Sequence, residues 1–311
     1  ETSTQQTSNS LTYFVYRIAH ITACIFCGYT ISFLFMGEHE CVHHTAFATP
    51  IYNEIVANLF GFACFRPVLH YRYYHWAHHR FTGDKQKDPE LQNTFIDFDI
   101  AGSLINYVLY LSGIPFWIDR MTTICRHATL FVFDNVFAVK LSAGIQELLL
   151  PKKLEYYLQQ KQRRYKVTLE AVLYLLMYFL MLVFFDVGKL WKYWFLPSLI
   201  GQVFLRAYLI AEHRECQSNT NMLSNTRTTK TFWLERQLAW NMPYHVEHHA
   251  FPYVPFYLLP DAHRALVQQL GGETQFYQKS GCNPDGREGY LSVHKKILND
   301  ILSKHSRVHS A

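Results

Sequence analysis

Two long apolar stretches constrain the fold of this 311-residue chain more than any other feature. Residues Thr168–Phe185 and Tyr193–Ala211 are each long enough to cross the hydrocarbon core of a bilayer as a helix. Gly188 and Lys189 lie between them and predict a tight turn, so the two stretches form a hairpin across the membrane. A third run, Ile18–Met36, is also long enough to span and leads into a histidine-rich segment. We therefore predict an all-α integral membrane protein.

The overall composition agrees with this prediction. Half of the residues are hydrophobic and only 17% are charged, which suits a protein with part of its surface in lipid. The net charge of +5 is modest and gives no reason to expect nucleic-acid binding. A mean hydropathy of -0.06 leaves a soluble all-α protein with unusually apolar core helices as the alternative.

Shorter apolar segments and a basic cluster complete the outline. Ile55–Phe65 is too short to cross squarely and predicts a tilted or re-entrant element. Ile100–Ile118 contains Gly113 and Pro115, which predict a broken or interfacial helix. Lysines and arginines at 152–166 precede the first long stretch, so we expect that end of the hairpin to be cytoplasmic.

We expect one domain over residues 1–311. Residues 1–10 are rich in Ser, Thr and Gln and predict disorder. Residues 11–215 and 240–268 form the membrane stem and a cap that carries the histidine clusters, and 270–311 form a polar C-terminal tail.

Ten of the 17 histidines gather in four places. The motif HECVHH occupies residues 39–44, H-x-x-H-H occurs at 75–79 and again at 245–249, and His213 follows the last apolar stretch. On a helix, residues at i, i+3 and i+4 share a face, so each H-x-x-H-H places three imidazoles on one side. This repetition predicts a metal site.

The identity of the metal follows from the number and position of these histidines. HECVH matches the H-E-x-x-H motif of zinc proteases, in which Glu40 would be the general base. A catalytic zinc site needs only three protein ligands, however, and imidazole suits iron as well as zinc. Clusters at the cytoplasmic ends of apolar helices face a lipid reservoir, where the chemistry required is oxidation of an unactivated C–H bond. Zinc has no redox chemistry, so we predict iron.

Several segments resemble the membrane-bound fatty acid desaturase and hydroxylase superfamily. They are HECVHHTAF, HWAHHRFTGDKQKDPEL, AEHREC, NTRTT and NMPYHVEHHAFPYVPFYLLPDAHRAL. The resemblance implies about four transmembrane helices under a cytoplasmic helical cap that holds a di-iron site. The segment before His39 is shorter than the two-helix hairpin usual in the family. We therefore expect either a missing beginning or an incomplete first crossing.

The resemblance also implies the residues of the site. The implied iron ligands are His39, His43, His75, His78, His79, His213, His245, His248 and His249. Glu40, Asp88, Glu212 and Glu247 are candidates to accept the N–H groups on the far side of the ligand rings. Asn241 is a candidate to hold a metal-bound water, with a turn role as the alternative. We expect His44 to support the ligands, although an H-x4-H pattern from His39 also permits it as a ligand.

The predicted function is O2-dependent oxidation of a lipid alkyl chain with two Fe ions as cofactors, most simply fatty acyl desaturation. A lipid or carotenoid hydroxylase or ketolase, a membrane zinc protease and a non-catalytic metal-binding membrane protein remain alternatives. The chain has no haem motif and no Fe–S cysteine spacing, so a separate electron donor is required. Cytochrome b5 or a ferredoxin with its reductase would dock near Arg72, Arg80, Lys85 and Lys87. The expected location is the endoplasmic reticulum membrane of a eukaryote or the inner membrane of a bacterium.

Overall fold

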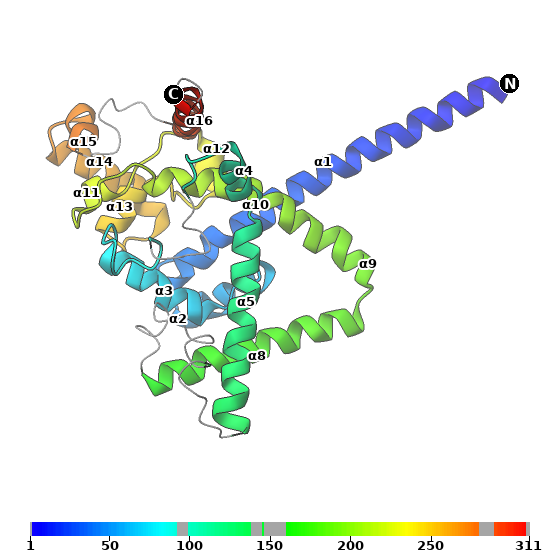
Figure 1. Cartoon of the computed structure of the whole chain (residues 1–311), viewed down its shortest axis with the longest axis horizontal. Helices are drawn as coiled ribbons and strands as arrows, with labels where there is room; N and C mark the ends of the chain where they lie inside the picture. Colours follow the sequence, from blue (N-terminus) through cyan, green and yellow to red (C-terminus); the bar gives the residue numbers. More distant parts are fainter. Residues whose placement is uncertain (1, 92–98, 138–144, 146–159, 280–288, 309–311) are drawn as a thin grey trace.

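The computed structural model describes residues 2–91, 99–137, 145, 160–279 and 289–308, and this part of the chain contains helices and no β-strand (Figure 1). The α-helices are α1 (Thr2–Val42), α2 (Pro50–Ala63), α3 (Val68–Phe81), α4 (Leu104–Ser112), α5 (Ile114–Phe131), α8 (Lys161–Phe184), α9 (Val187–Leu190), α10 (Leu196–His213), α11 (Met222–Asn225), α12 (Trp233–Leu238), α13 (His245–Ala250), α14 (Leu259–Gln269), α15 (Glu273–Lys279) and α16 (Tyr290–Val308). Two π-helical turns, η1 (Val132–Val136) and η2 (Trp191–Phe195), and one 3-10 turn, η3 (Phe256–Leu258), complete the secondary structure.

Three helices of the described residues are long and apolar enough to cross a membrane, namely Thr12–Val42, Lys161–Phe184 and Val187–His213. These overlap the three stretches predicted from the sequence, of which only Phe185 falls outside its helix, and they confirm the all-α membrane class. A stem of about four helices stays a prediction. In Figure 1, α8 and the continuous α9–α10 unit form a hairpin, and the N-terminal part of α1 extends away from the other helices.

The turn of the hairpin lies earlier than the sequence predicts. Helix α8 ends at Phe184, and the Asp186 side chain caps α9 by accepting a hydrogen bond from the Lys189 backbone N–H at 2.7 Å. An aspartate at this position satisfies a backbone donor that a helix start leaves free. Gly188 and Lys189 therefore belong to the first turn of α9 instead of the loop.

Helices α1 and α10 cross at two glycines. A Cβ atom added at Gly28 would overlap the Pro197 carbonyl, and one added at Gly201 would overlap the Gly28 carbonyl. Small residues at such crossings let two helix backbones approach closely, which strengthens their van der Waals contact within a membrane. Beyond the crossing, Phe33 and Tyr208 pack edge to face with ring centroids 5.5 Å apart. This contact fixes the ends of both helices beside each other.

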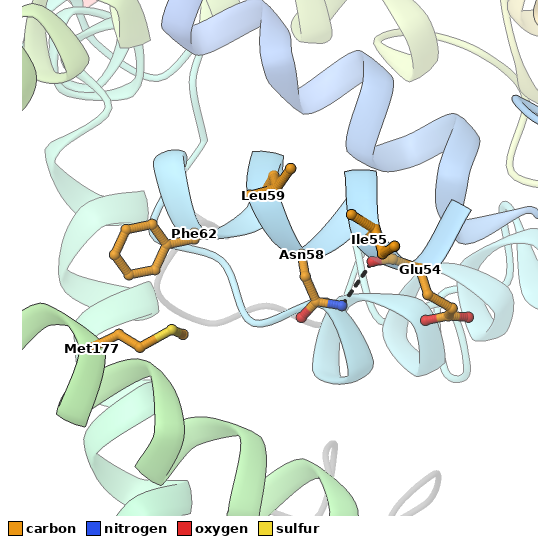
Figure 2. Close-up of a pocket in the computed structure, with 6 residues that line it drawn as sticks. All are labelled: Glu54, Ile55, Asn58, Leu59, Phe62 and Met177. Carbon is orange, nitrogen blue, oxygen red and sulfur yellow. Dashed lines mark hydrogen bonds between the residues drawn. The ribbon is translucent and has the colours of Figure 1, made fainter. Parts of the chain in front are cut away.

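The two shorter apolar segments are both helical. Helix α2 is too short to cross a membrane, and its exposed residues Ile51, Ile55 and Leu59 lie on its outer side. The predicted break within residues 100–118 is real, because Gly113 takes a left-handed conformation (φ 69°) between α4 and α5. The stem helix α8 borders α2, and a mainly apolar groove lies between them (Figure 2).

The two ends of the chain contain more helix than the sequence suggests. Helix α1 includes most of residues 1–10, for which we predict disorder, and α16 occupies much of the predicted polar tail. Val293 and Ile297 of α16 pack in one buried cluster with Tyr107 and Ile210. The ring of His294 connects α16 to α4 and α10. It accepts a hydrogen bond from the Tyr107 hydroxyl at 2.7 Å and donates one to the Ala207 carbonyl at 2.9 Å. The domain boundaries stay a prediction, and Lys152 and Lys153 lie outside the described residues.

Candidate metal centre

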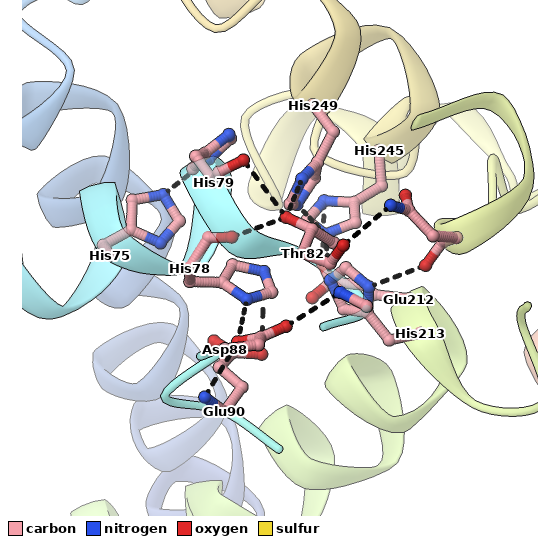
Figure 3. A network of polar contacts seen from close by, with 12 residues as sticks. His75, His78, His79, Thr82, Asp88, Glu90, Glu212, His213, His245 and His249 are labelled. Atoms are coloured by element: carbon pink, nitrogen blue, oxygen red, sulfur yellow. Dashed lines mark hydrogen bonds and ion pairs between the residues drawn. The ribbon is translucent and has the colours of Figure 1, made fainter. Parts of the chain in front are cut away.

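Four separate elements bring the nine predicted ligand histidines together. His39 lies in the last turn of α1, with His43 just beyond its end, and His213 is the final residue of α10. Helices α3 and α13 each contribute one H-x-x-H-H triplet. Figure 3 shows side chains of α3, α10 and α13 meeting in one network. The convergence depends on the α1–α10 crossing, because that packing places the histidine-bearing ends side by side.

The first group contains five buried histidines, and one ring nitrogen of each lies within 4.8 Å of the others: His39, His43, His75, His79 and His248. Four of these rings bring their Nε2 atoms close together. The Nε2 of His75 lies 2.8 Å from that of His43 and 3.0 Å from that of His79. The Nε2 of His248 lies 3.1 Å from that of His79, which brings α13 onto the same centre.

The second group contains four histidines. Ring nitrogens of His78, His213 and His249 lie within 4.8 Å of one another. The Nε2 of His245 lies 3.0 Å from that of His213 and 3.1 Å from that of His249, so this ring belongs to the same group. The two groups adjoin, since the rings of His79 and His249 stack with centroids 4.2 Å apart.

The spacing of the nitrogens fits a metal with more than four ligands. Two nitrogens bound to one ion at roughly 2.1 Å lie about 3.0 Å apart at a right angle and about 3.4 Å apart at a tetrahedral angle. Five pairs of Nε2 atoms among the nine histidines lie 2.8 to 3.1 Å apart. They match ligands at right angles, and five histidines in one group exceed the tetrahedral number. The donor set therefore suits two neighbouring transition-metal ions.

The outer nitrogens of three histidines in the four-histidine group face an acceptor. The Nδ1 atom of His78 lies 2.9 Å from Asp88 Oδ1, and that of His213 lies 3.1 Å from the Asn225 carbonyl oxygen. The Nδ1 atom of His249 faces the Thr82 hydroxyl at 3.2 Å. Such acceptors hold the proton on Nδ1 and leave the Nε2 lone pair for a metal. Figure 3 shows Asp88 beside the ring of His78.

Two buried carboxylates stand slightly farther from ligand rings. Glu40 Oε1 lies 3.8 Å from His248 Nδ1, and Glu212 Oε1 lies 3.7 Å from His245 Nδ1. Glu40 is held by two donors to its other oxygen, the Thr45 hydroxyl at 2.8 Å and the Phe256 backbone N–H at 3.2 Å. Both carboxylates lie beside ligand rings but beyond hydrogen-bond distance, so their role as acceptors for these rings stays a prediction.

Burial keeps most of these rings neutral. Loss of solvent, together with the charges of neighbouring imidazoles, holds the pKa of His75, His79 and His248 well below the usual range. Burial also lowers the pKa of His78, but the carboxylates of Glu90 and Asp88 outweigh this effect and raise the pKa to about 9. A neutral imidazole is the form that binds a metal, so most of the cluster is prepared for an ion at neutral pH.

Comparison with known proteins identifies the family. The sequence pattern of the fatty acid desaturases matches residues 16–281. This chain belongs to the fatty acid desaturase family. It is therefore an oxidoreductase, and the buried histidine cluster described above corresponds to the histidine boxes of the family.

Three relatives are similar to this chain over most of their lengths. Dihydrorhizobitoxine desaturase of Bradyrhizobium elkanii is 26% identical over 82% of this chain and 70% of its own. Fatty acid conjugase FAC2 A of Calendula officinalis is 23% identical over 87% of this chain and 72% of its own. The sphingolipid delta(4)-desaturase DES1-like protein of Arabidopsis thaliana is 23% identical over 88% of this chain and 68% of its own.

Three candidate residues of the site have partners other than the ligand rings: His44, Asn241 and Glu247. His44 leaves α1 in a left-handed conformation (φ 60°), and its Nε2 faces Glu54 at 3.3 Å, away from the cluster. Asn241 has a left-handed backbone (φ 55°) and accepts from the Tyr244 backbone N–H at 3.0 Å, which agrees with the alternative turn role, while its side chain donates to the distant Phe256 carbonyl at 3.0 Å. Glu247 does not accept from a ligand ring, because its oxygens are bound by the Thr228 hydroxyl at 2.6 Å and by His263 Nδ1 at 2.7 Å.

Sequence reasoning missed the partners that come from outside the boxes. Thr82 and Asn225 contact ligand rings, and His263 holds Glu247. Glu90 was also missed, although its exposed carboxylate comes within 3.8 Å of His78 Nε2. Spacing gives a signal only for Thr82, which lies four residues after His78 on the same helical face.

Proposed function

We propose that this desaturase-family protein is a membrane-bound, non-haem di-iron enzyme that uses O2 to remove hydrogen from lipid alkyl chains. Fatty acyl desaturation is the reaction we favour. The observation that carries the proposal is the convergence of nine histidines into two adjoining groups with Nε2 separations of 2.8 to 3.1 Å. This donor set fits two ions of the borderline kind that imidazole prefers, which includes iron.

The nine histidines would hold the two irons, five at one position and four at the other. Iron bound there would supply the redox chemistry that oxidises an unactivated C–H bond with O2. Asp88, Glu40 and Glu212 would orient the ligand rings and keep protons on their outer nitrogens. Forming one double bond removes two hydrogens from the chain. Reduction of O2 to two waters then requires two more electrons and two protons from outside.

The geometry argues against the zinc protease alternative. A general base must lie within hydrogen-bond reach of the water that it activates. The Glu40 carboxylate is fully buried, and one oxygen is already bound by Thr45 and by the Phe256 backbone. Its other oxygen faces the outer nitrogen of His248, so it points at the back of a ligand ring and not at the shared centre of the Nε2 atoms.

A mainly apolar groove between α2 and α8 supports the proposal of an alkyl substrate. The groove between α2 and α8 is lined by Ile55, Leu59, Phe62 and Met177, with Glu54 and Asn58 as its polar residues (Figure 2). Glu54 is bound to His44 and Arg72, which places this part of the groove near the end of α1. We propose that the groove admits lipid chains from the bilayer toward the centre.

The electron donor and the location of the active site are further parts of the proposal. The donor would be cytochrome b5 or a ferredoxin with its reductase, on the cytoplasmic side. Basic residues at the start of α8 support this side, since Arg163 stacks on Tyr73 of the histidine-bearing helix α3 at 5.1 Å. Positive charge beside membrane spans is typical of cytoplasmic segments.

Metal and product analysis test the proposed function together. Purified protein is expected to contain two irons per chain and, with O2 and a reducing system, to yield an alkyl product with one new double bond. Mass spectrometry of lipids from an expression host of known lipid composition would detect it. A hydroxylated or keto product would favour the hydroxylase or ketolase alternative on the same centre. One zinc per chain would overturn the proposal, and an intact centre without turnover would favour a binding protein.

A further inference from the structure

Thr82 closes helix α3 directly behind the second histidine triplet. Its side chain is buried, and the hydroxyl donates to the His78 carbonyl at 2.6 Å. The single hydroxyl proton is used in that bond, so the oxygen can only accept from His249 Nδ1 at 3.2 Å. Thr82 therefore holds the His249 proton on Nδ1.

Asn225 does the same for a second ring of the group. Its backbone carbonyl oxygen lies 3.1 Å from His213 Nδ1, and a carbonyl can only accept. Its side-chain amide donates to the Thr82 carbonyl at 3.0 Å and to the Asn219 carbonyl at 2.9 Å. The two residues thus form one buried unit that connects the end of α3 to the last residue of α11.

This unit controls which nitrogen each ring presents to the centre. With protons on Nδ1, His249 and His213 each direct an Nε2 lone pair at the Nε2 of His245, at 3.1 and 3.0 Å. A proton on either Nε2 would place a donor where a metal must bind.

We propose that Thr82 and Asn225 are positioning residues of the four-histidine group, which fix the protonation of His249 and His213 for metal binding. This inference rests on the proposed function, because it requires a metal at that group. Their loss is expected to weaken one metal position and to leave the five-histidine position unchanged. Outer partners of this kind typically change metal affinity about 10- to 100-fold.

The competing explanation is that the Thr82 hydroxyl serves only the helix end. Thr168 provides a matched control, since it is equally buried and its hydroxyl donates to the carbonyl four residues earlier, Arg164, at 2.8 Å. No contact joins Thr168 to a histidine of the cluster among the described residues. Thr168→Val therefore removes the same backbone bond without removing an imidazole partner.

The experiment is a Co²⁺ titration of the metal-free full-length protein in detergent, followed by the visible absorption bands of bound Co²⁺. The wild type is expected to bind two ions. Thr82→Val should bind one as tightly as wild type and the other about 10- to 100-fold more weakly. Thr82→Ser retains the hydroxyl and should restore the second ion, while Asn225→Asp, which replaces the amide donor, should weaken it.

Three results would overturn the inference: two wild-type affinities in Thr82→Val, equal weakening in Thr168→Val, or loss of both ions that Thr82→Ser does not restore. The position retained in Thr82→Val serves as an internal test of folding. Failure of the wild type to bind two ions would instead count against the proposed function itself.

Discussion

His213 is the clearest case of a single residue whose place in the site is decided by packing. It lies outside every histidine box, yet its ring has an acceptor on one side, the Asn225 carbonyl, and another imidazole, His245, on the other. His44 is the opposite case, since it adjoins a box but its ring faces Glu54. For these two histidines, the direction in which packing points the ring decides whether it joins the cluster.

This contrast gives a prediction with a matched control. His213→Ala should reduce bound metal from two ions to about one per chain and lower turnover at least 100-fold, because it removes a direct metal ligand. His44→Ala should retain both ions and most activity. Metal analysis of the two membrane-purified variants is the measurement. Two ions and wild-type turnover in His213→Ala would place the missing ligand elsewhere.

At the scale of helices, the site depends on how closely α1 and α10 approach. Gly201 sits where any side chain would meet the backbone of α1, whereas a Cβ at Gly188 would meet only an Asp186 carboxylate oxygen at 3.2 Å. Overpacking of a tight contact typically costs 1–3 kcal/mol, while Gly to Ala in a helix is favourable by roughly 0.5–1 kcal/mol, which offsets the small shift required of the Asp186 side chain.

Gly201→Ala is therefore expected to lower the thermal unfolding temperature of the purified protein and to weaken metal binding at both groups. Gly188→Ala should leave the unfolding temperature unchanged or raise it slightly. Thermal unfolding in one detergent, with metal content measured on the same samples, compares the two variants. An unchanged unfolding temperature in Gly201→Ala would show that the crossing tolerates separation.

The spanning helices and the clustered histidines could be predicted from the sequence because both produce local sequence patterns. Long apolar runs predict the spans, and H-x-x-H-H on a helix predicts imidazoles on one face. The partners of the rings could not be predicted in the same way. Glu247 lies within a box but binds His263, while Asn225 is distant in sequence yet supports His213. Only tertiary packing decides such pairs. The packing of α16 against α4 and α10 could not be predicted for the same reason.

For the whole molecule, the position of positive charge indicates where the proposed electron donor would dock. The hairpin is antiparallel, so the start of α8 and the end of α10 lie at one end of the spans, with the histidine-bearing helices (Figure 1). The predicted docking face loses one member, because Arg72 is paired with Glu54 at 2.9 Å. Arg80, Lys85 and Lys87 remain exposed. They precede Asp88, which contacts the ligand His78.

An acidic electron donor is expected to dock on these three residues. Steering by exposed charges weakens with salt, since the Debye length falls from about 10 Å at 0.1 M to about 3 Å at 1 M. The rate at which the donor reduces the oxidised centre should therefore fall at high salt. The double variant Lys85→Glu/Lys87→Glu should already be slow at low salt, because it reverses the charge that attracts the donor.

Lys189→Glu is the matched control, because Lys189 lies at the hairpin turn, at the opposite end of the spans from the centre. This variant should keep the wild-type rate and its full salt dependence. A rate that changes with neither salt nor charge at Lys85 and Lys87 would place the docking surface elsewhere. Electrons would then reach the centre by a route other than the short path from this face through Asp88 to His78.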